Sequence, residues 1–129
     1  MRNDGFHFSG IYFTADRQRH TGANFRANTS AAIEIKDLTG MNAVQGKFHL
    51  GASISICKEE GQLVMNNPDI LSAYDAAGLD PIEVHLLTFP FDLGSPFRSG
   101  EHYTLHFSLW DKNGKAKMKV EQSFFILPD

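Results

Sequence analysis

Residues 100–127 have the sequence GEHYTLHFSLWDKNGKAKMKVEQSFFIL, and this stretch decides the fold. Before the turn Asp-Lys-Asn-Gly at 111–114, every second residue is apolar: Tyr103, Leu105, Phe107 and Leu109. After the turn, the apolar set continues as Ala116, Met118, Val120, Phe124 and Ile126. Alternate residues of a strand point to opposite faces, so this pattern predicts a β-hairpin with one apolar face. The two-residue loop is either 112–113 or 113–114, and both choices place the two apolar sets on the same face.

Five further segments have the alternation or the residue types of strands: 6–14, 31–38, 48–58, 62–65 and 82–89. In the first, Gly10 marks a bulge or a switch between sheets. Pro90 either stops the last of these strands or confines it to a sheet edge. Asn67 and Pro68 suit a helix start and Gly78 suits a helix end, so we expect one short helix there. Seven short strands separated by turn signals predict an all-β, antiparallel two-sheet sandwich.

Length and composition favour one β-sandwich domain over residues 1–129. Hydrophobic residues make up 42% of the chain and the net charge is −3, which gives no indication of nucleic-acid binding. No apolar run is long enough for membrane insertion. Residues 1–5 lack the apolar core of a signal peptide, so we expect a cytoplasmic protein, or a periplasmic or cell-surface one if a leader has been removed.

Residues 97–105, FRSGEHYTL, resemble the approach to strand F of fibronectin type III and other immunoglobulin-like domains. Those domains place a Gly three residues before a Tyr and an apolar residue two after it. The resemblance implies an immunoglobulin-like sandwich in which Tyr103 is buried and its hydroxyl bonds backbone at 97–99. The chain departs from the antibody pattern because Cys57 is its only cysteine, so no disulfide is possible, and because Trp110 lies beside the hairpin turn.

The residues that could support catalysis or metal binding do not form a recognisable motif. His102 and His106 are about 13 Å apart along a strand, so they could share a metal only with His49 or His85 from other strands. Cys57 has no adjacent helix start or cation on its own face that would activate it. We therefore expect no catalytic residues, no metal site and no cofactor.

The best candidate for binding is the polar, non-periodic segment 16–30, which the sequence predicts to be a long loop. It carries Arg17, Arg19, His20 and Arg26, the residues we expect to contact a partner. That partner would be acidic, and it could be a second copy of the chain, because residues 59–101 hold eight acidic residues against one Arg. Three other cations, Lys115, Lys117 and Lys119, are interpreted as a solvated strand edge.

The leading functional hypothesis is a non-catalytic immunoglobulin-like module that binds a protein or a surface glycan. Loops on a rigid sandwich commonly carry such recognition residues. One alternative is a structural subunit that docks into a larger assembly through a strand edge. Another is a small metal-dependent enzyme built from the four histidines named above. The sequence favours the first because it contains a well-patterned sandwich and no catalytic constellation.

Overall fold

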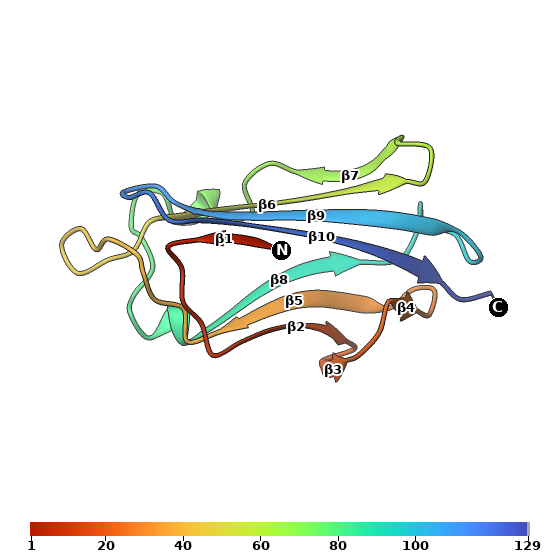
Figure 1. The fold of residues 1–129 in the computed structure, drawn as a ribbon, viewed down its shortest axis with the longest axis horizontal. Coiled ribbons are helices and arrows are strands. Elements are labelled where there is room, and N and C mark those ends of the chain that lie inside the picture. Colours follow the sequence, from red (N-terminus) through yellow and green to blue (C-terminus); the bar gives the residue numbers. More distant parts are fainter. Residues whose placement is uncertain (129) are drawn as a thin grey trace.

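The alternating segments form two facing sheets in the computed structural model, which describes residues 1–128 (Figure 1). The six-stranded sheet has the order β1 (Arg2–Asp4), β10 (Lys117–Ile126), β9 (His102–Asp111), β6 (Leu50–Lys58) and β7 (Leu63–Asn67), with β4 (Asn24–Phe25) also paired to β10. The four-stranded sheet has the order β3 (Gln18–His20), β2 (Gly10–Ala15), β5 (Ser30–Lys36) and β8 (Leu86–Asp92). Among the described residues, only the pairing of β4 with β10 is parallel. The predicted all-β sandwich is confirmed.

The closing hairpin has the predicted faces, and its register is now defined. Trp110 pairs with Lys117, and the last backbone hydrogen bond between the two arms of the hairpin runs from Asp111 N to Ala116 O. A two-residue loop at 113–114 would give the same register. The actual turn is wider, because residues 112–115 lie between the last hydrogen-bonded pair. The buried Asp111 holds it: its carboxylate accepts hydrogen bonds from Asn113 N at 3.0 Å and from Asn42 N at 2.8 Å. Both apolar sets face the opposite sheet, as expected.

The core lies between the sheets and is rich in phenylalanine. Phe89 of β8 meets Phe107 of β9 with ring centroids 5.0 Å apart, and Phe25 of β4 meets Phe91 of β8 edge to face at 6.2 Å. All four side chains are at most 3% exposed. Because such rings bury large apolar areas and pack well edge to face, these contacts join the two sheets.

Tyr103 lies in the position that the resemblance to immunoglobulin-like domains implied. Its side chain is 1% exposed, and its hydroxyl accepts a hydrogen bond from Arg98 N at 2.9 Å. The same hydroxyl donates to the Glu101 carboxylate at 3.0 Å. The predicted hydrogen bond to upstream backbone is thus confirmed, and it anchors the loop that precedes β9.

Two predictions at the N-terminal end are wrong in their boundaries. The first strand was predicted over 6–14, but β2 begins at Gly10, and the chain crosses from one sheet to the other between Asp4 and Gly10. The predicted loop at 16–30 contains β3 and β4. These strands are three and two residues long, too short to produce an alternating pattern, and Phe25 is a core residue.

The predicted helix is reduced to a single 3-10 turn, η1 (Ser72–Tyr74), and a second turn, η2 (Glu83–His85), precedes β8. Asn67 ends β7 instead of capping a helix. The reason is a tertiary contact: the Asp69 carboxylate accepts from Ala52 N, and Ile70 N donates to Ala52 O, which ties this segment to β6. Pro90 lies inside β8, which is an edge strand, so the edge alternative is confirmed.

Candidate partner-binding surface

Arg17 lies at the tip of the β2–β3 hairpin. Ala15 pairs with Gln18, so Asp16 and Arg17 form a two-residue connection with φ of 50° and 70°. Positive φ at both positions matches the right-handed twist of the strands, but Arg in this region costs about 1–2 kcal/mol relative to the right-handed conformation. The Asp16 carboxylate accepts from Ser30 N at 3.1 Å, which fixes the hairpin to β5. Arg17 is exposed.

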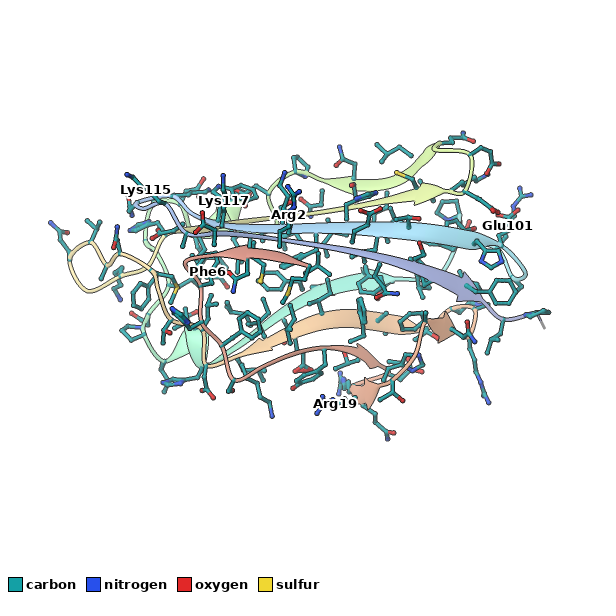
Figure 2. All side chains as sticks on the ribbon, viewed as in Figure 1. Arg2, Phe6, Arg19, Glu101, Lys115 and Lys117 are labelled. Atoms are coloured by element: carbon teal, nitrogen blue, oxygen red, sulfur yellow. The ribbon has the colours of Figure 1, made fainter. Side chains whose placement is uncertain are left out.

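Arg19 lies on the outer face of the four-stranded sheet, away from the core (Figure 2). Its guanidinium carbon is 4.7 Å from the centre of the Tyr12 ring, and the Lys36 ammonium is 5.7 Å from the same centre. Aromatic faces attract cations at these distances. Tyr12 therefore has two cations near its ring, while Glu34 is its partner across the β2–β5 pair and forms no ion pair within residues 1–128.

The other two predicted residues lie elsewhere. His20 is paired with the core-facing Phe13, stacks on Phe25 with centroids 4.4 Å apart, and places Nε2 2.7 Å from Asn24 O. It therefore belongs to the inner face of β3. Arg26 follows β4 beside the end of β10 and is exposed. The structure brings Arg19 together with Tyr12 and Lys36, two residues that the sequence did not single out because they belong to different strands.

The acidic region at 59–101 is partly neutralised by internal ion pairs. Lys112 contacts both Asp69, at 2.6 Å, and Asp75, and Lys47 contacts Asp80. Burial alone would raise the pKa of Asp69, but the Lys112 ammonium and two backbone amides outweigh it and hold that pKa below its usual value. These pairs reduce the negative charge that this region would offer to the cations of a second copy.

The four histidines proposed for a metal site have other neighbours: His102 and His106 are both on β9, whereas His49 precedes β6 and His85 ends η2. His85 Nδ1 is 3.2 Å from the Asp37 carboxylate, His49 Nδ1 is 3.2 Å from Asp75 O, and the His102 ring lies against Phe125. His106 is on the outer face of β9. Within the described part of the chain, no group of three or more His, Cys, Asp or Glu residues is arranged to hold a metal ion.

The lysines of the closing hairpin are not at a free edge, which corrects the sequence interpretation. β1 pairs with β10 along Lys117–Lys119, and Arg2 lies directly opposite Lys119. The alternation of lysines placed them on one face, but no local signal indicated that the N-terminal residues would join them, because that pairing links opposite ends of the chain.

Comparisons with known proteins do not assign the chain to a family, since no protein-family model and no curated protein matches it. Along residues 1–128, no helix has the length and apolar character needed to cross a membrane. The case for a function therefore depends on the surfaces described above.

Proposed function

We propose that the chain is a non-catalytic, immunoglobulin-like module that binds an acidic segment of a partner protein through the β2–β3 hairpin surface, defined as Arg17, Arg19, Tyr12 and Lys36. The observation that carries this proposal is the Tyr12 ring with the Arg19 and Lys36 cations 4.7 Å and 5.7 Å from its centre. Tyr and Arg are the residue types that most often dominate binding energy at protein interfaces. A guanidinium also grips a carboxylate with two parallel hydrogen bonds.

The order of the strands supports the immunoglobulin-like assignment. In chain order, β2, β5, β6, β7, β8, β9 and β10 take the places of strands A, B, C, C′, E, F and G. Strands A, B and E then form one sheet, and C′, C, F and G form the other. Tyr103 lies near the start of the strand in the F position. This fold carries no function by itself, so the binding role is supported only by the surface residues.

The backbone of Arg17 gives a second line of support. A glycine at this position would relieve the cost of the left-handed conformation, yet the chain has an arginine there. Strained backbone is concentrated at functional positions, where a particular side chain is needed. Arg17 extends the cationic surface beyond the end of the sheet, where a partner can reach it.

Docking through a strand edge has less support. β3 has three residues, and β8 carries Pro90, which has no N–H to offer a new strand. β1 and β4 cover part of β10. Among the described strands, β7 offers the longest edge without such protection, and it has five residues.

The test is the binding of a labelled, glutamate-rich peptide to wild type and to Arg17→Gln/Arg19→Gln at low and high salt. We expect the double variant to bind at least about tenfold more weakly at low salt. The difference should shrink at high salt, because the screening length falls from about 10 Å at 0.1 M to about 3 Å at 1 M. Arg26→Gln is the matched control and should bind like wild type.

Equal peptide affinity of wild type and the double variant would refute the proposal. Sedimentation of the same proteins tests the alternative that the acidic partner is a second copy of this chain. Wild-type dimers that dissociate in the double variant would identify a second copy as the acidic partner.

A further inference from the structure

The outer face of the six-stranded sheet carries polar and charged side chains in register. One row runs across four strands from Ser53 through Ser108 and Lys119 to Arg2. The next row runs from Ser55 through His106 to Glu121. On β6, β9 and β10 these residues alternate with more buried ones, so their side chains point away from the core. Arg2 is exposed on β1, opposite Lys119. Hydroxyl, imidazole, carboxylate and cationic groups are thus gathered on one exposed face.

The cations on this face repel one another. Arg2 and Lys119 are directly opposite across the β1–β10 pair, where like charges are destabilising. Figure 2 shows Lys115, Lys117 and Arg2 following one another on the same side of the molecule. Neither Arg2 nor Lys119 has an ion-pair partner within residues 1–128. Asp4 is the strand partner of Lys117, but their side chains form no ion pair. An anion bound between Arg2 and Lys119 would relieve this repulsion.

A hollow of about 480 Å³ lies beside Arg2 and Lys119. It lies at the start of β1, and from there to β4 the edge of β10 has no neighbouring strand. Its volume is within the range of small-ligand sites. Arg2 and Lys119 line it together with His106, Ser108 and Glu121. The remaining lining residues are Met1, Phe107 and Val120.

We propose that this hollow binds a sugar unit that carries a carboxylate, such as a uronic or sialic acid. The carboxylate lies between Arg2 and Lys119, which provide charge-assisted hydrogen bonds. The ring hydroxyls bond to His106, Ser108 and Glu121, which together offer donors and acceptors.

Glu121 selects this ligand class over other anions. Its carboxylate accepts hydrogen bonds from sugar hydroxyls but repels a ligand with a negative charge on every unit, such as nucleic acid or an oligoglutamate. Trp110 lies two residues from Ser108 on the same face of β9, packed over Gly51, where a Cβ would come within 2.1 Å of the indole. A neighbouring sugar ring can lie against its half-exposed indole.

The experiment is calorimetric titration with N-acetylneuraminic acid, monomeric galacturonic acid, a neutral glucose oligomer and an oligoglutamate. We expect wild type to bind an acidic sugar and not the neutral one. Lys119→Gln should weaken that binding about tenfold or more, and it should melt no lower than wild type because it removes a like-charge contact. Lys58→Gln, a lysine on β6 outside the hollow, is the control and should bind like wild type.

Glu121→Gln, made in the Arg17→Gln/Arg19→Gln background, tests the selection between anions and should increase the binding of oligoglutamate relative to the acidic sugars. Failure of every acidic sugar to bind wild type would overturn the proposal, as would equal binding of the neutral sugar. Stronger binding of oligoglutamate than of the acidic sugars, kept in Arg17→Gln/Arg19→Gln and lost in Lys119→Gln, would identify the hollow as a site for acidic peptides instead. Arg17→Gln/Arg19→Gln should keep the sugar affinity, so this site and the proposed protein-binding surface can fail independently.

Discussion

Replacing Tyr103 by Phe removes one hydroxyl from the buried start of β9 and keeps the ring. The ring contacts with Phe97 at 5.0 Å and Phe124 at 5.6 Å therefore remain. The lost group leaves Arg98 N–H without its acceptor in a partly buried position. Such an unpaired donor costs about 1–3 kcal/mol of unfolding free energy. Glu101 is half-exposed and can bond to water, so its lost hydrogen bond adds little.

For a chain of 129 residues, the unfolding entropy is about 0.27 kcal/mol/K, so this loss lowers Tm by about 4–11 °C. Thermal unfolding followed by circular dichroism measures it. Tyr74→Phe is the control, because Tyr74 is 42% exposed and should lose nothing measurable. An unchanged Tm in Tyr103→Phe would mean that the hydrogen bond to Arg98 does not stabilise the fold, and the reasoning would be refuted.

The pH dependence gives an independent check. Burial raises the pKa of Tyr103 above its usual value of 10.0, and the Glu101 carboxylate adds to this, although the bond from Arg98 N lowers it. Folding favours the neutral phenol of Tyr103. Its contribution to the free energy of unfolding is therefore complete below about pH 10 and is lost as the pH rises through the folded-state pKa. Tyr12 and Tyr74 are present in both proteins, so the comparison isolates Tyr103. The stability difference between wild type and Tyr103→Phe should therefore narrow above about pH 10, and a constant difference would contradict the assigned cause.

Three further substitutions test other parts of the fold and the surface. Gly51→Ala should displace the indole of Trp110 and lower Tm, and because Trp110 is the only Trp, an unchanged emission spectrum would contradict the packing. Lys112→Met should cost about 1 kcal/mol near neutral pH. The loss should fade as the pH falls below about 4 through the lowered pKa of Asp69, and a pH-independent loss in denaturant titrations would argue against the ion pair. Arg17→Gly should leave the free energy of unfolding unchanged or raise it by up to about 1 kcal/mol, because glycine relieves the left-handed backbone but also gives the unfolded chain more freedom. A clear destabilisation would show that the Arg17 side chain supports the fold.

The sequence by itself determined the elements whose pattern is local. The alternation in residues 102–126 specified the hairpin and its buried face, because side-chain direction along a strand depends only on position. Pro90 indicated either the end of a strand or an edge because it lacks an N–H, and the structure has the edge. The residues around Tyr103 were sufficient to predict its burial and its hydrogen bond to upstream backbone.

Only the tertiary structure decided which elements lie side by side. Asp69 resembles a helix-start residue in the sequence, but its bond to Ala52 on β6 ties the segment to the sheet instead. The cation clusters arose in the same way: Arg19 and Lys36 meet over Tyr12, and Arg2 meets Lys119, through pairings between strands distant in the chain. Strand order depends on how the two sheets bury their apolar faces together, a property of the whole chain that no local pattern contains.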